Sequence, residues 1–178
     1  HAAANSDRAQ QLDVVPYDLV WLPALHDEIT DLTPAFGAEK RQLLPILAEM
    51  CCFGDRFVAF PYLLDLGLLY YRRDLLEKYG FSTPPRTWNE LECMAAQIQD
   101  QERVAGHADF WGYVWQGHVS ERLTCNAIEW QYSEGGGVII EASGAISINN
   151  CRAQMALERA RRWIGAISPP DIRTYDES

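Results

Sequence analysis

The sequence predicts an α/β fold, and three observations carry that prediction. Segments with the apolar spacing of helices alternate along the chain with apolar, strand-like runs. The connections between those runs are long enough for the crossovers that parallel strands require. The chain has 178 residues, of which 48% are hydrophobic, so it can bury a core without disulfides, as one domain or two small ones.

The predicted strands are short runs of mostly apolar residues, several of them β-branched or aromatic. A Gly54–Asp55 turn signal precedes one of them. The runs lie at 13–22, 56–62, 66–73 and 109–115, and a small hairpin is expected over 138–148 with its turn at Ala142–Gly144.

The predicted helices are supported by apolar spacing and by residues that cap helix ends. Asp74 with Glu77, and Thr87 with Glu90, have the spacing of capping boxes. Asn150 is a candidate N-cap for the last helix. Helices are expected at 2–12, 21–29, 39–50, 74–80, 88–100, 119–133 and 151–164.

The negative charge balance and the lack of long apolar runs argue against several classes of partner. The net charge of −10 argues against nucleic acid and anionic membrane surfaces, because both need clustered Lys and Arg. The segment at 1–13 lacks the basic and apolar regions of a signal peptide. No run approaches the roughly 18 apolar residues of a membrane-spanning helix. We therefore expect no nucleic-acid partner and no membrane insertion.

The sequence contains no motif for a cofactor, a metal or a nucleophile. There is no Walker A loop, GxGxxG, GxSxG or HExxH motif. His26, Asp27 and Glu28 could touch a metal, but a solvated helix face explains them better. The five cysteines form no metal spacing and are expected to be buried small hydrophobes, with a single Cys125–Cys151 bridge left open. We expect neither a cofactor nor a metal.

Two carboxylates are candidate functional groups. Asp65 lies in the apolar run YLLDLGLLYY, where a charge is costly unless it is paired or has a function. Glu121 opens a predicted helix, where the helix dipole also favours an acid. A glycosidase that uses Asp65 and Glu121 as its carboxylate pair is therefore one alternative.

Aromatic side chains form a second group of candidates, because flat rings stack against the C–H faces of sugars. Core packing is expected for Trp111 and Trp130. Trp21 and Trp115 end predicted strands, where open α/β sheets bind ligands, so ligand contact and core packing are both open for them. Tyr62 is the further candidate for a ligand contact.

A long run at 59–98, AFPYLLDLGLLYYRRDLLEKYGFSTPPRTWNELECMAAQI, resembles the extracellular solute-binding proteins of carbohydrate ABC transporters. The closest type is the trehalose/maltose-binding branch. The later segments FWGYVWQG, ERLTCNAIEW and GGGVIIE are similar to the same family and occur in its order. The resemblance covers nearly the whole chain but lacks both ends of the family pattern, so the chain resembles an internal segment.

The resemblance implies a periplasmic-binding-protein-like architecture, a two-lobed α/β clamp with a mixed sheet that closes on a sugar. On this view 1–65 is part of the first lobe. Residues 66–108 form a crossover strand and the helices of the lobe junction, and 109–178 form the first half of the second lobe. The implied function is binding of a di- or oligosaccharide for an ABC importer, without enzymatic activity, in the periplasm or outside the cell. ABC permease subunits are the implied partners.

The resemblance also assigns roles to individual residues. Asp65 matches an acid that hydrogen-bonds sugar hydroxyls, and Trp21 matches the first-lobe edge of the cleft. In the same comparison, a ligand-binding loop in the second lobe of the family corresponds to Gln116, Gly117 and Glu121 of this chain. Leu63 and Ser120 stand where relatives place aromatics. The alternative to sugar binding is a non-binding remnant that forms a homo-oligomer through its open sheet edges.

Overall fold

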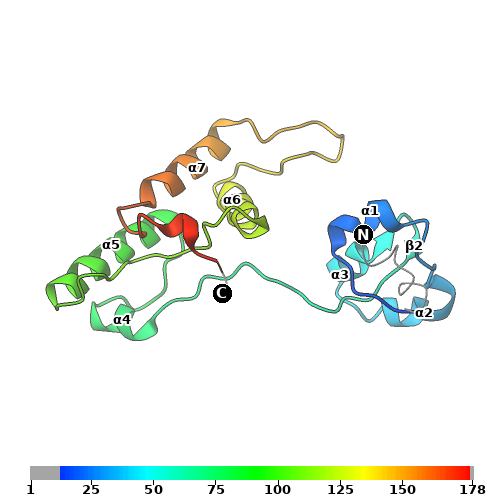
Figure 1. Ribbon diagram of the computed structural model, residues 1–178, viewed down its shortest axis with the longest axis horizontal. Helices are drawn as coiled ribbons and strands as arrows, with labels where there is room; N and C mark the ends of the chain where they lie inside the picture. Colours follow the sequence, from blue (N-terminus) through cyan, green and yellow to red (C-terminus); the bar gives the residue numbers. More distant parts are fainter. Residues whose placement is uncertain (1–12, 177–178) are drawn as a thin grey trace. The chain divides into compact units, whose positions relative to one another are not determined.

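A computed structural model describes residues 13–176 of the chain (Figure 1). The chain divides into two compact units, His1–Leu66 and Gly67–Ser178. The division of the chain into lobes at 1–65, 66–108 and 109–178 stays a prediction. The expected helix at 2–12 lies outside the described residues.

The first unit consists of short helices around one small β-hairpin. Its elements are η2 (Leu19–Trp21), α1 (Leu22–Leu25), α2 (Thr33–Lys40), α3 (Pro45–Met50), β1 (Cys52–Phe53) and β2 (Arg56–Phe57). The two strands pair antiparallel through a turn in which Gly54 has a φ of +59°, a backbone conformation that favours glycine. The side chain of Phe57 is fully buried and forms the centre of this unit.

Phe57 is also held by its backbone. Its N–H donates to Thr33 Oγ1 at 2.9 Å, and its carbonyl accepts from the Leu32 N–H at 2.7 Å. These bonds attach the strand to the start of α2, so one residue joins the hairpin to the helices.

The second unit is built on three longer helices. Its elements are α4 (Arg73–Lys78), α5 (Trp88–Val104), α6 (Glu121–Ser133), α7 (Cys151–Trp163) and η3 (Ile172–Thr174). The buried core lies where α5, α6 and α7 meet, and α6 packs against α7. Figure 1 shows these three helices. The members of the core are Leu91, Ala95, Trp130, Ala156, Ala160, Trp163 and Ile167.

The predicted caps of α5 and α7 are confirmed. Thr87 Oγ1 accepts from the Glu90 N–H at 3.1 Å, and Asn150 Oδ1 accepts from the N–H groups of Arg152 and Ala153. The predicted Asp74 box is wrong, because α4 begins one residue earlier and Asp74 pairs with Arg72 instead.

The predicted helix at 39–50 is wrong as one element, because residues 41–44 separate α2 from α3 and Pro45 opens α3. Proline is tolerated in the first turn of a helix, where its missing N–H has no partner to lose. The helix at 21–29 shortens to α1, and the helix at 88–100 extends to Val104.

Most of the predicted strands are absent from the described part of the chain. The run at 13–22 ends in η2 and α1, and only the first two residues of 56–62 form a strand. The runs at 66–73 and 109–115 lie outside any ladder among residues 13–176. The hairpin over 138–148 is reduced to one bridge, Ile140–Ile146, with the expected turn. A strand requires a partner to hydrogen-bond it, and an apolar run does not specify that partner.

All five cysteines are free thiols, so no Cys125–Cys151 bridge forms. Only Cys51 is buried, and Cys93, Cys125 and Cys151 are exposed. The expectation that the cysteines are buried hydrophobes is therefore wrong for most of them. No helix within residues 13–176 has the length and apolar character needed to cross a bilayer.

Glu102 on α5 is a buried carboxylate that joins α5 to α4. Lys78 Nζ and Tyr79 Oη each donate to its Oε1 at 2.6 Å, and His107 Nε2 lies 3.5 Å from Oε2. The hydrogen bonds from Lys78 and Tyr79 hold the pKa of Glu102 below its ordinary value of 4.5. A lowered pKa in the folded state means that the ionised group stabilises the fold.

We predict that Glu102→Gln lowers the thermal midpoint at pH 7. The stabilisation by ionised Glu102 is complete above the pKa of the unfolded chain and is lost as the pH falls through the lowered folded pKa. Scanning calorimetry between pH 7 and pH 3 should therefore show the gap between wild type and variant closing at the acid end. The exposed Glu158→Gln is the control. A gap that stays constant across this pH range would contradict the assignment.

Candidate ligand-binding site

The first unit holds three of the predicted ligand-contacting residues, Trp21, Tyr62 and Asp65. Trp21 ends η2, which is capped by the Asp18 carboxylate: its Oδ1 accepts from the Val20 N–H at 3.4 Å. The Trp21 side chain is partly exposed, and Tyr62 is 83% exposed. Asp65 is exposed as well, in an extended segment with no helix or strand. Two aromatic side chains and a carboxylate are thus open to solvent.

The second unit brings Trp115, Gln116, Gly117 and Glu121 together around the start of α6. The Gln116 carbonyl accepts from Asn126 Nδ2 at 3.0 Å, which ties this loop to the helix behind it. Glu121 is exposed in the first turn of α6, where the helix dipole favours a negative charge.

Gly117 is required by close packing. A Cβ at this position would lie 2.4 Å from the Ile172 carbonyl oxygen, which is closer than real side chains approach. The next residue continues the attachment, because the His118 N–H donates to the Tyr175 carbonyl at 3.0 Å. The loop before α6 is therefore fixed between α6 and the segment around η3.

Trp115 is packed into the core of the second unit. Its ring meets Trp130 edge to face, with centroids 5.0 Å apart, and its Nε1 is buried without a hydrogen bond to any described residue. Burial raises the pKa of the neighbouring Tyr113 to about 12. Trp130 is buried as expected, whereas Trp111 is half-buried with the Arg103 guanidinium 4.5 Å from its ring centre. Trp115 therefore has a structural role whether or not it also contacts a ligand.

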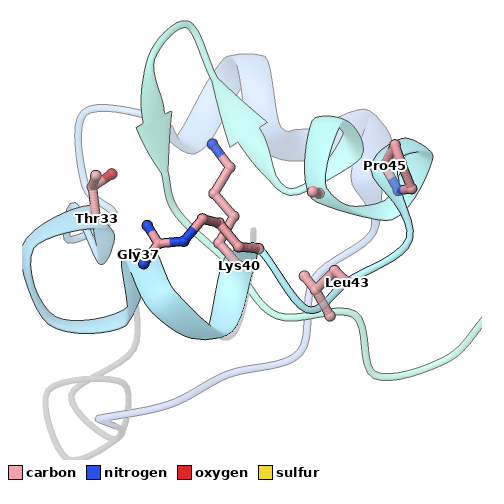
Figure 2. Close-up of a pocket in the computed structure, with 7 residues that line it drawn as sticks. Thr33, Gly37, Lys40, Leu43 and Pro45 are labelled. Carbon is pink, nitrogen blue, oxygen red and sulfur yellow. The ribbon is translucent and has the colours of Figure 1, made fainter.

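A hollow of the first unit lies elsewhere, between α2 and α3 (Figure 2). It measures about 440 Å³. Its lining is mostly apolar but includes the basic side chains of Lys40 and Arg41. Its lining residues are Thr33, Gly37, Lys40, Arg41, Leu43, Pro45 and Ala48. None of these was singled out by sequence reasoning, because they share no motif and meet only when α2 and α3 fold together.

A second hollow, of about 460 Å³, lies in the second unit beside Trp88. Several of the polar side chains that line it bind each other. Trp88 Nε1 donates to Ser133 Oγ at 2.8 Å, and Arg159 forms an ion pair with Glu134. None of the predicted ligand-contacting residues lines either hollow.

His26 has an alternative role to the metal contact considered from the sequence. Its ring stacks on Phe53 with centroids 4.2 Å apart, and its Nδ1 lies 2.8 Å from the Pro23 carbonyl oxygen. Within residues 13–176, His, Cys, Asp and Glu side chains form no group of three or more that could hold a metal.

The family of bacterial extracellular solute-binding proteins matches residues 2–147 of the chain. The chain belongs to this family. Its members are substrate-binding proteins of ABC transporters and not enzymes, which agrees with the sequence prediction and removes the support for a carboxylate-pair glycosidase. One relative, the probable ABC transporter-binding protein of Deinococcus radiodurans, is 42% identical over 171 residues, which are 96% of this chain and 40% of that protein.

Solved structures of solute-binding proteins share the fold. Maltose-bound MalE3 of T. maritima matches with a TM-score of 0.79 and 35% identity, over 89% of this chain and 40% of that chain. A solute-binding protein of Agrobacterium radiobacter, solved with ribitol, matches with a TM-score of 0.73 and 21% identity, over 98% of this chain and 44% of its own. The periplasmic-binding-protein fold predicted from the sequence is thereby confirmed. The chain spans about two fifths of the length of these relatives.

Proposed function

We propose that this chain carries part of the sugar-binding site of the solute-binding component of an ABC importer, and that its ligand is a di- or oligosaccharide. The observation that carries the proposal is the likeness to maltose-bound MalE3, at 35% identity over 89% of the chain. Exposed Tyr62, Trp21 and Asp65 supply side chains of the kind that sugar recognition needs.

The chemistry of these side chains suits a neutral, hydroxyl-rich ligand. The exposed faces of Tyr62 and Trp21 offer flat apolar surface to the C–H side of a pyranose ring. The carboxylates of Asp65 and Glu121 are hydrogen-bond acceptors, and each oxygen can accept a hydrogen bond from a sugar hydroxyl. Gln116 adds an amide that both donates and accepts. Aromatic surface with a few polar groups is typical of small-molecule sites.

The same proposal includes the partners of the importer. ABC permease subunits would receive the sugar from the binding protein, which would act in the periplasm or outside the cell, as the family name indicates.

We predict that calorimetric titration of the chain with maltose, trehalose, sucrose and glucose gives saturable heat with at least one disaccharide. Asp65→Asn and Tyr62→Ala should each weaken the affinity by about tenfold, which corresponds to about 1.4 kcal/mol. The control is Tyr132→Ala, another exposed tyrosine, which lies on α6 and should leave the affinity unchanged. The proposal fails if none of these sugars gives heat at millimolar concentration, or if the control weakens binding as much as the two site variants.

A further inference from the structure

The hollow between α2 and α3 is lined by positive charge without negative charge. Lys40 and Arg41 are the basic residues of its lining, and no lining residue is acidic. Glu39 on α2 and Glu49 on α3 are exposed and lie outside the lining. The chain has 25 acidic and only 15 basic residues, so two cations beside one hollow with no acid among its walls require an explanation.

Neither cation has an ionic partner among residues 13–176. Elsewhere in that part of the chain a lysine such as Lys78 forms a short ion pair, with Glu102 at 2.6 Å. Lys40 is half-buried, and its Nζ lies 5.9 Å from the centre of the buried Phe57 ring. A partly desolvated ammonium without a counter-ion is unfavourable, and an anion in the hollow would relieve that cost.

The position of these residues at the end of α2 accounts for only part of their charge. Lys40 is the last residue of α2 and Arg41 is its C-cap, where the helix dipole favours cations. That dipole places about half a unit of negative charge at a helix end, against two whole positive charges. The more distant acids of the chain are screened, because the Debye length is about 8 Å at physiological salt. The field in the hollow is therefore positive.

The size and the apolar walls of the hollow favour an organic anion over a bare ion. Its volume of about 440 Å³ lies within the range of roughly 300–1,000 Å³ of small-molecule sites. In Figure 2 the Lys40 side chain stands between Gly37 and the apolar pair Leu43 and Pro45. The guanidinium of Arg41 can pair with both oxygens of a carboxylate or phosphate, and the ammonium of Lys40 adds a point charge.

Gly37 keeps one wall of the hollow open. It lies within α2 and its φ is not positive, so the backbone would accept any residue, and glycine lowers helix stability relative to alanine. A Cβ at this position would meet no described atom within 4 Å. Neither the backbone conformation nor packing against described residues requires a glycine here, whereas space for a ligand does.

We propose that the hollow between α2 and α3 binds a small organic anion. Its carboxylate or phosphate group meets Lys40 and Arg41, and its apolar part rests on Leu43, Pro45 and Ala48. None of the residues proposed to contact sugar lines this hollow, so the anion is a second ligand at a separate site.

NMR titration of the whole chain with four probes tests the proposal. Benzoate and phenyl phosphate carry the two candidate anionic groups on the same ring, benzyl alcohol carries the ring without charge, and inorganic phosphate has no apolar part. We expect at least one of the two aromatic anions to give saturable ¹H–¹⁵N shift changes at Gly37, Lys40 and Arg41. Its affinity should be at least about tenfold tighter than that of benzyl alcohol and of inorganic phosphate.

The comparison of benzoate with phenyl phosphate shows which anionic group the site prefers. The proposal is overturned if neither aromatic anion shifts these amides at millimolar concentration. It is equally overturned if benzyl alcohol or inorganic phosphate binds as tightly as the better aromatic anion, because charge and apolar contact would then not act together.

Three variants separate binding in the hollow from general attraction to basic residues. Gly37→Leu should fill the hollow and abolish binding without lowering the thermal midpoint, because its Cβ has room and leucine is the better helix former. Arg41→Gln should weaken the affinity about tenfold. Arg162→Gln removes an exposed cation on α7 and is the matched control. Unchanged affinity in Gly37→Leu or Arg41→Gln would refute the site, and so would an equal loss in Arg162→Gln.

Discussion

Replacing Trp163 by alanine is expected to cost about 3–5 kcal/mol of unfolding free energy, the usual range for a large aromatic removed from a core. Trp163 ends α7 and is 2% exposed. Its ring lies among Trp88, Tyr113 and Trp130, at centroid distances of 5.5, 5.2 and 5.4 Å. Truncation removes these contacts together and leaves a cavity that the three fixed helices cannot close.

Urea denaturation followed by circular dichroism measures this effect. Trp163→Phe should cost less than Trp163→Ala, because it keeps most of the ring and loses chiefly the indole N–H that donates to Glu92 at 2.6 Å. The exposed Tyr132→Ala is the control and should stay within about 0.5 kcal/mol of wild type. A loss for Trp163→Ala no larger than that of Tyr132→Ala would mean that the aromatic cluster is not the core of this unit.

Phe57→Ala should have a comparable effect on the first unit, about 3–5 kcal/mol. Its side chain is fully buried, and the ring of Phe60 meets it edge to face with centroids 5.0 Å apart. A unit of this size buries a small core and has little stability to spare. The loss of its largest buried side chain should therefore unfold the unit under native conditions.

The Leu32 amide reports this unfolding, because it donates to the Phe57 carbonyl at 2.7 Å. We expect Phe57→Ala to abolish its protection from hydrogen exchange. Phe36→Ala is the matched control, since Phe36 is 40% exposed and its removal should slow or speed exchange only slightly. Retained protection of the Leu32 amide in Phe57→Ala would show that the unit is held by something other than this residue.

The helices of the second unit could be predicted because their signals are local. Thr87 and Asn150 immediately precede their helices, and each accepts from N–H groups two or three residues further along the chain. Donor and acceptor therefore lie within four consecutive residues of the sequence. The apolar spacing of Leu91, Ala95 and Ile98 likewise lies within one helix, and all three are buried.

The strands could not be predicted because their partners are not local. The run at 66–71 has the composition of a buried strand but no ladder among the described residues. The run at 13–22 is similar in composition, yet Asp18 caps η2 within it and Pro23 occupies the first turn of α1. Local helix-starting signals outweighed apolar composition there.

The residues of the candidate site likewise differ in how far the sequence alone could predict their environment. Asp65 could be singled out because a charge in an apolar run is unusual wherever it lies. Trp21 and Trp115 could not be distinguished from sequence, since both lie at the ends of strand-like runs. The structure separates them: Trp21 is 46% exposed, and Trp115 packs edge to face on Trp130.

The central claim is that the chain contributes sugar contacts through the predicted residues of both units. It is tested most directly by ¹H–¹⁵N NMR titrations of the chain with maltose, trehalose, sucrose and glucose in turn. The account predicts shift changes at Trp21, Tyr62 and Asp65 in the first unit and at Gln116, Gly117 and Glu121 in the second. The result that would contradict it is shift changes confined to the hollow between α2 and α3, or no shift change with any of the four sugars at millimolar concentration.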